Sequence, residues 1–328
     1  MPKFLRYASA LIFCFTVLVV AVYAFESRGA MLAPVWQTNM YETETLNRRE
    51  QGLDIRGEFP MVLDEFGPAY ESINTRIDAA IDTLVEGSRR IRARSVTFDY
   101  NIEHTSDVVS IVIYAHSRAV TDRTSVKSVN FNPSDGRAMS LTQAVGHNIT
   151  PLAEARIAEM IRLDPATYHA AFSARPTGQA FYMTNTSLVL LFDEFQLSSV
   201  PGATTSISFQ RSNLRFYTLQ RLDYTISDDG YAIRLIPVGR VLAGLGYTTA
   251  WVDGEAVVSR GGRTIITLTP GDNNYQLNGV MQRSLEVAPT MSGNRMYVPI
   301  SFFDQILPLT AFNVAANGSV TFMTYLGR

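Results

Sequence analysis

Residues 7–25 carry no charged side chain and follow Lys3 and Arg6 near the start of the chain. The run is close to the roughly 20 apolar residues that cross a bilayer, and it exceeds the about 7–15 residues of an ordinary signal-peptide core. The segment Val22-Tyr23-Ala24 nevertheless offers small residues suited to cleavage. We therefore expect an N-terminal hydrophobic helix in residues 1–25, either a transmembrane anchor or a cleaved signal peptide. Because the basic residues precede the run, both alternatives place the rest of the chain outside the cytoplasm.

The composition is that of a protein with substantial apolar cores. The chain has 328 residues, of which 46% are hydrophobic and 18% charged, and its net charge is -2. Two domains are expected, because single cores stop growing near about 250 residues. No basic excess is available to displace counterions, which excludes nucleic-acid binding through bulk charge. The one cysteine, Cys14, lies in the apolar run, so the exported part has no disulfide.

Residues 50–216 alternate between strand and helix patterns, which predicts an α+β domain. A helix is expected over residues 68–90, because apolar side chains recur there at helical spacing. They are Ile73, Ile77, Ile81 and Leu84. Residues 96–102 and 109–113 alternate with period two, as antiparallel strands do. Residues 26–49 are polar and weakly patterned and are expected to form a linker.

Residues 217–328 contain an internal repeat, which predicts a second α+β domain made of two similar halves, each with antiparallel sheet and a packed helix. The matching pieces are Ile236-Pro237-Val238 with Leu245 and Val298-Pro299-Ile300 with Leu307. Trp251 and Phe312 occupy near-equivalent places in the two halves.

This second domain resembles the copper amine oxidase N-terminal-like domain, or stalk domain, of exported bacterial proteins. The residues that carry the resemblance are Pro237-Val-Gly-Arg240, Ala243-Gly-Leu-Gly246, Trp251, Leu277-Asn-Gly279, Ala288-Pro289, Tyr297-Val-Pro299-Ile300 and Phe302-Phe303. The resemblance implies the fold of that domain. It does not imply copper, because residues 170–328 contain neither His nor Cys and copper prefers imidazole or thiolate ligands.

The first domain resembles the extracellular domain shared by lysozyme-sensing anti-sigma-V factors and peptidoglycan deacetylase C. The matching residues are Phe131-Asn-Pro-Ser-Asp-Gly136, Met139-Ser-Leu141, Phe181-Tyr-Met-Thr184, Leu188 to Leu197, and Pro201-Gly202. The family often has a Gly-Gly-Ala-His loop after a strand-ending Tyr, whereas here Tyr114 is followed by Ala115-His116-Ser117. The resemblance implies a domain displayed at the cell wall.

No set of side chains that supports catalysis stands out. A Gly-x-Ser-x-Gly elbow, a catalytic cysteine and a His-Glu-x-x-His helix are all absent from the sequence. Asp193 and Glu194 form the best carboxylate pair, but adjacent strand residues point to opposite faces. His104 and His116 are expected far apart on one hairpin, with residue 104 opposite Val108. We therefore expect no enzyme activity, no metal and no cofactor, with an unrecognised carboxylate site as the alternative.

Three segments remain as candidate contacts with a ligand. The first is the basic cluster at the end of the expected helix, where cations suit the helix dipole or an anionic wall polymer. The second is the expected loop after Tyr114. The third follows a strand and combines aromatic and acidic side chains. The candidate residues are Arg89, Arg90, Arg92 and Arg94; Tyr114 and His116; and Phe192, Asp193, Glu194 and Phe195.

These observations predict a non-catalytic extracytoplasmic protein of a Gram-positive cell envelope, either anchored by residues 7–25 or secreted to the wall. The expected ligand is peptidoglycan or a wall-active protein such as lysozyme. The alternatives are a sensor of the anti-sigma type, an enzyme that modifies wall polysaccharide, and a structural spacer. Six residues before the apolar run leave little room to hold a sigma factor, which disfavours the sensor.

Overall fold

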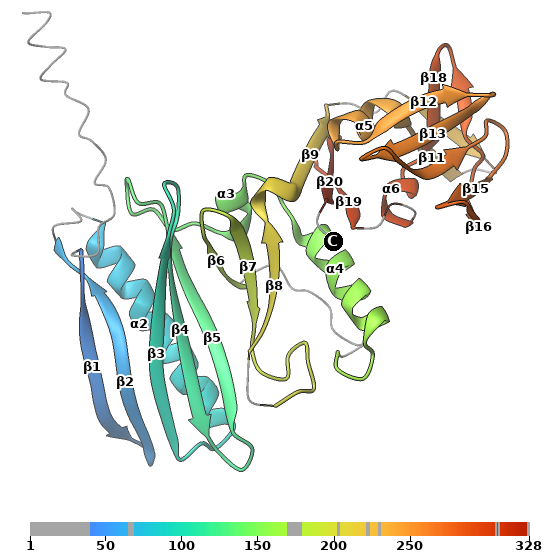
Figure 1. Cartoon of the computed structure of the whole chain (residues 1–328). Coiled ribbons are helices and arrows are strands. Elements are labelled where there is room, and N and C mark those ends of the chain that lie inside the picture. Colours follow the sequence, from blue (N-terminus) through green and yellow to red (C-terminus); the bar gives the residue numbers. More distant parts are fainter. Residues whose placement is uncertain are drawn as a thin grey trace, which may run out of the picture.

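The architecture is α+β with mainly antiparallel sheets, as predicted. Figure 1 shows a long sheet that carries one helix, a second layer beside it, and a C-terminal lobe at one end. The apolar run at residues 7–25 lies outside the described residues. No helix within the described residues is long and apolar enough to cross a membrane. The computed structural model describes residues 40–64, 69–168, 179–201, 204–220, 224–228, 231–305, 307 and 309–326.

The first layer is a five-stranded sheet with one long helix packed on it. Its strands are ordered β1-β2-β3-β4-β5, and the β2–β3 pair is parallel while the other pairs are antiparallel. The elements are β1 (Tyr41–Glu50), β2 (Leu53–Val62), α2 (Tyr70–Arg90), β3 (Ser95–His104), β4 (Val109–Arg118) and β5 (Arg123–Phe131). The predicted apolar stripe of α2 is buried against the sheet, where it meets Ile55, Phe98 and Ile111. The helix predicted over residues 68–90 is therefore confirmed.

Strand β1 corrects the expectation of a linker over residues 26–49 for its part from residue 41 onward, and residues 26–39 lie outside the described residues. It pairs with β2 in unbroken antiparallel register, from Tyr41 opposite Val62 to Glu50 opposite Leu53. Its sequence has many charges and little apolar alternation, because it is an edge strand held by main-chain pairing. Gln51 and Gly52, both with positive φ, make the tight turn that sets this register.

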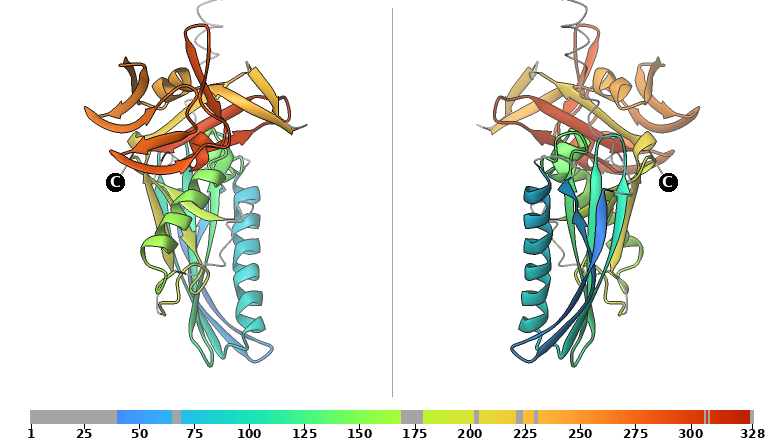
Figure 2. Two further views of the ribbon diagram at one scale, coloured as in Figure 1. Left: turned by 90° about the vertical axis from the view of Figure 1, so that its right-hand side faces the viewer. Right: turned by 90° about the vertical axis from the view of Figure 1, so that its left-hand side faces the viewer.

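The second layer is the three-stranded sheet β6-β7-β8 with two helices beside it. Its elements are α3 (Leu141–Val145), α4 (Thr150–Leu163), β6 (Ala180–Met183), β7 (Ser187–Phe192) and β8 (Thr205–Gln210). Strand β7 is buried on both faces: Leu188 and Leu190 face the core below α4, and Val189 and Leu191 face the first sheet. Figure 2 shows α2 and α4 on opposite sides of the layered strands.

The C-terminal lobe contains two sheets, ordered β10-β11-β18-β17 and β12-β13-β14-β15-β16. The elements are β10 (Tyr224–Asp228), β11 (Tyr231–Pro237), α5 (Val238–Gly244), β12 (Thr248–Val252), β13 (Glu255–Arg260), β14 (Arg263–Leu268), β15 (Asn274–Leu277), β16 (Val280–Ser284), β17 (Thr290–Ser292), β18 (Arg295–Pro299) and α6 (Phe302–Gln305). The two copies of the predicted repeat meet directly, because Ile236 on β11 pairs with Val298 on β18. Each strand is followed by a short helix, and Leu245 and Leu307 are both buried.

A third small sheet, ordered β19-β20-β9, joins the lobe to the second layer. Its strands are β9 (Leu214–Leu219), β19 (Thr310–Val314) and β20 (Val320–Tyr325). Val320 and Phe322 point into the core of the lobe, whereas Met323 and Tyr325 point into the core of the second layer. The position expected to divide the domains, between residues 216 and 217, therefore lies inside a strand whose sheet is shared by both cores.

Candidate functional site

The four arginines of the basic cluster lie at the end of α2 and in the turn that follows it. Arg89 forms an ion pair with Glu50 at 2.8 Å, and a carboxylate one turn earlier on α2 lies 3.7 Å from both Arg89 and Arg90. Arg92 and Arg94 are exposed and form no ion pair with a described residue. Two of the four charges are thus already compensated inside the protein.

Tyr114 and His116 lie within β4, which corrects the expectation of a loop there. The strand continues through both residues because it pairs with β3 on one side and β5 on the other. Tyr114 is half-buried, and burial is the main reason that the pKa of its phenol is raised, with Tyr182 next. His116 is exposed, and its ring nitrogens lie 3.1 Å from an oxygen of Asp99 and 3.1 Å from Thr124 Oγ1.

The two histidines of the β3–β4 hairpin, His104 and His116, do not come together. His104 lies opposite Val109, one residue beyond the expected partner, and His116 lies opposite Thr97 near the other end of the same hairpin. Among the described residues, no three His, Cys, Asp or Glu side chains gather as a metal site requires.

Asp193 and Glu194 both form hydrogen bonds with the edge of β5 that does not pair with β4. The carboxylate of Glu194 accepts from the Thr124 N–H at 2.7 Å, and that of Asp193 accepts from the Val126 N–H at 2.7 Å. The Glu194 N–H also donates to the Thr124 carbonyl at 2.9 Å. The expectation that the two side chains point to opposite faces is wrong, because β7 ends at Phe192 and both residues lie in the following turn. The pair closes a sheet edge and is not placed to flank a bond in a substrate.

The remaining predicted residues divide between the core and the surface. Phe192 is 1% exposed and belongs to the core of the second layer. Phe195 has a positive φ and lies under the Arg123 guanidinium, 5.7 Å from the ring centre. His116 and Glu194 line one polar hollow of about 680 Å³, which none of the clustered arginines borders. The structure thus brings together only part of the predicted set.

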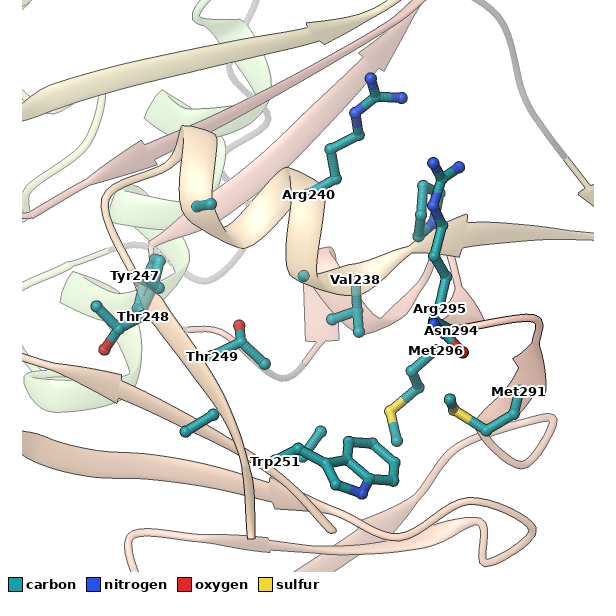
Figure 3. A pocket seen from close by; sticks show the side chains of 15 residues that line it. Val238, Arg240, Tyr247, Thr248, Thr249, Trp251, Met291, Asn294, Arg295 and Met296 are labelled. Carbon is teal, nitrogen blue, oxygen red and sulfur yellow. The ribbon is translucent and has the colours of Figure 1, made fainter. Parts of the chain in front are cut away.

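A more apolar hollow, which we call the Trp251 groove, lies between β12, α5 and the β17–β18 hairpin, with a volume of about 570 Å³. Trp251 is 53% exposed and Met291 40% exposed, which is unusual for large apolar side chains. Figure 3 shows the indole beside the thioethers of Met291 and Met296, with the guanidinium groups of Arg240 and Arg295 toward the opposite end. The groove therefore has an apolar end and a cationic end.

The Trp251 groove follows the edge of β12. Four consecutive residues of this strand, from Thr248 to Trp251, line the groove. Because side chains alternate between the faces of a strand, consecutive lining residues mean that the groove runs along the strand edge. Asp253 and Gly254, both with positive φ, form the two-residue turn that folds β13 back onto the other edge of β12.

Charge in the groove is of one sign. Arg240 and Arg295 are exposed and pair with no carboxylate of the described residues, and no Asp or Glu lines the groove. Two cations at the rim of a largely apolar hollow favour a ligand that combines apolar surface with a negative charge.

The residue pattern did not identify Trp251 as a site residue, although the repeat contained the signal. Its counterpart in the other half, Phe312, packs against the core of the lobe and lies 6.2 Å from the Phe322 ring. Trp251 occupies the near-equivalent place in its half, one residue out of register, yet it faces solvent. A pattern shows that both positions are aromatic but does not show which of them is covered.

Comparison with solved structures gives only weak similarity, and no curated protein matches the chain. One structure is of a DUF3298 family protein from Pseudomonas aeruginosa PAO1, with 12% identity and a TM-score of 0.35. Another is of a DUF3298 family member from Bacteroides fragilis NCTC 9343, with 8% identity and a TM-score of 0.32. Each match covers 52% of this chain and 91% of the other protein.

The match to a protein family is confined to the C-terminal lobe. It covers the repeat, β12 and the β17–β18 hairpin, and so it includes the whole Trp251 groove. The resemblance of residues 50–216 to the lysozyme-sensing domain stays a prediction. Residues 233–322 match the copper amine oxidase N-terminal domain, a non-catalytic domain, in agreement with the stalk-type domain expected there.

Proposed function

We propose that this chain is a non-catalytic, extracytoplasmic binding protein of the cell envelope and that it binds peptidoglycan in the Trp251 groove. The observation that carries the proposal is the exposed indole at one end of a groove whose other end holds two uncompensated arginines. Export through residues 7–25 would place this groove at the wall.

Peptidoglycan has the chemistry that the groove favours. Its sugar rings and short peptides present apolar faces that can pack on an indole, whose large amphipathic surface suits contact with a partly wet ligand. Its carboxylates suit guanidinium groups, which bind planar anions through paired hydrogen bonds. The lining residues Thr248, Thr249 and Asn294 add polar groups along the same path.

The competing functions have less support. A carboxylate enzyme would need a free acid–base pair, whereas Asp193 and Glu194 are engaged by the main chain of β5. A wall-active protein such as lysozyme remains the competing ligand. Any such partner with a basic surface would be repelled at the cationic end of the groove, so a complex with it would have to form elsewhere.

The test is co-sedimentation of the full-length protein, held in mild detergent, with insoluble peptidoglycan over a range of salt concentrations. We expect saturable pelleting that resists moderate salt, because part of the contact is apolar. Trp251→Ala should weaken binding by at least about tenfold, as loss of a central aromatic contact does. Val280→Ala is the matched control, because Val280 is 61% exposed in the same lobe and lies outside the groove.

Two results would contradict the proposal. One is the absence of saturable pelleting. The other is pelleting that Trp251→Ala leaves unchanged, which would place the binding surface elsewhere. Immobilised lysozyme serves as the parallel ligand, and binding to it alone would support the competing function.

A further inference from the structure

We propose that the Trp251 groove binds the peptide stems of peptidoglycan, and not its glycan strands, by pairing amide groups of an extended stem with the outer edge of β12. This inference rests on the proposed function and specifies which part of the polymer is recognised.

The first step of the argument concerns the edge of β12. This strand is the outermost one of its sheet, and β13 is its one strand neighbour within the described part of the chain. Val252 and Glu255 flank the two-residue turn, so they exchange main-chain hydrogen bonds, and the next pair, Trp251 and Ala256, does not. By the same alternation, the N–H and C=O groups of Trp251 and Thr249 point away from β13 and toward the groove.

The second step compares this edge with the other long edges of the molecule. The edge strand β1 carries Glu42, Glu44, Arg48 and Arg49, the kind of charge that protects an exposed edge from pairing. The edge of β5 is closed by the carboxylates of the turn after β7. Strand β12, with the sequence TTAWV, has no charge, and all five of its residues are exposed. It is therefore an edge without the usual protection, which is suited to receive a peptide.

The third step concerns the ends of the groove. A strand laid on β12 would pass the apolar end formed by Trp251 and Met291 and would reach the cationic end formed by Arg240 and Arg295. A peptide with a free C-terminal carboxylate satisfies both ends at once. Peptide stems provide such carboxylates together with a short main chain. Glycan strands provide no comparable run of amide groups.

The glycan alternative is weaker on the same observations. Trp251 is the one exposed aromatic side chain of the groove, since Tyr247, the other aromatic ring among the lining residues, is 5% exposed. A chain of sugars would have one ring to stack on. The unpaired main-chain groups of β12 would then remain unused.

The experiment uses the full-length protein in detergent and three probes. The first is intact insoluble peptidoglycan, the second is the same material stripped of its stems by an amidase, and the third is a synthetic stem pentapeptide as a soluble competitor. We expect pelleting with the intact polymer, at least tenfold weaker pelleting with the stripped glycan, and competition by the free peptide. Equal pelleting with intact and stripped material would overturn this inference and leave the proposed function standing, whereas no pelleting with either would overturn the proposed function.

Two further comparisons test the mode of binding. Thr249→Pro removes an outward N–H from the edge and should weaken peptide binding by at least tenfold relative to Thr249→Val, which loses the same hydroxyl but keeps the N–H. A pentapeptide with a C-terminal amide should compete at least tenfold less well than the free acid, and Arg295→Gln should abolish that difference. The amide comparison needs no change in the protein, so it decides the matter even if Thr249→Pro does not fold. Equal competition by acid and amide would overturn the role of the arginines.

Discussion

Replacement of Glu194 by alanine removes the acceptor that the Thr124 N–H binds at 2.7 Å. Glu194 is 4% exposed, so water has little access to the site and the amide loses its partner. A hydrogen bond to a charged group contributes about 1.5–3 kcal/mol, and an unsatisfied buried donor has a cost of similar size. We therefore expect the free energy of unfolding to fall by about 2–3 kcal/mol. Glu194→Gln, which retains an oxygen acceptor, should lower it by about 1 kcal/mol.

The neighbouring Asp193→Ala should have a smaller effect, about 1 kcal/mol, because Asp193 is less buried than Glu194 where it accepts from the Val126 N–H. The two substitutions should not be additive, because both carboxylates hold the same turn after β7 to the same strand, β5. Once one bond is lost, the turn after β7 can move away from β5, and the second bond is weakened with it.

Urea unfolding followed by far-UV circular dichroism measures these changes. With a slope of about 3 kcal/mol per molar, the Glu194→Ala midpoint should fall by roughly 1 M. Hydrogen exchange should rise in the peptide that contains Thr124 and Val126. Asp82→Ala, an exposed carboxylate on α2, is the control and should change stability by less than about 0.5 kcal/mol. An unchanged midpoint for Glu194→Ala would refute the structural role and return the pair to the list of candidate catalytic groups.

Two other changes have outcomes that the structure specifies. Burial lowers the pKa of His147, whose ring stacks on Phe216 at 4.1 Å, so the folded protein favours the neutral ring. The contribution of His147 to the free energy of unfolding should be fully present above the ordinary pKa of about 6.5, and it should be lost as the pH drops through the lowered value. His147→Phe should therefore flatten a plot of melting temperature against pH. Gly244→Ala places a Cβ 2.0 Å from the Tyr217 ring and should cost about 1–3 kcal/mol. Gly239→Ala in the same helix meets nothing within 4 Å and should stabilise by up to about 1 kcal/mol, so equal melting temperatures for the two variants would contradict the packing argument.

Periodic patterns predicted the parts of the fold that are buried on one side. The four-residue spacing of Ile73, Ile77 and Ile81 could be satisfied only by a helix with one covered face, and α2 has that face. The repeated pair of Ile236 and Val298 predicted two similar halves, and these two residues meet across the β11–β18 pair. In each case the burial of side chains is the physical cause of the pattern.

Features that depend on main-chain pairing were not predictable in the same way. Strand β1 forms from a charged sequence because β2 supplies its hydrogen bonds, and no side-chain alternation records that. Asp193 and Glu194 resembled a carboxylate pair, but their partners are amides about seventy residues away. Trp251 is exposed because, in the described part of the chain, no further strand pairs with the outer edge of β12, and that depends on the tertiary structure.

The shared sheet β19-β20-β9 has a consequence for when the protein can become stable. Alternate residues of β20 complete two different cores, with Phe322 on one side and Tyr325 on the other. Tyr325 packs edge-on against Phe209 at 5.2 Å, far earlier in the chain. A core that needs residues of β20 cannot close before that strand has been made. The two cores should therefore become protected together, once β20 is in place, and a protein shortened before Val320 should be cleaved by proteases in the second layer and the lobe.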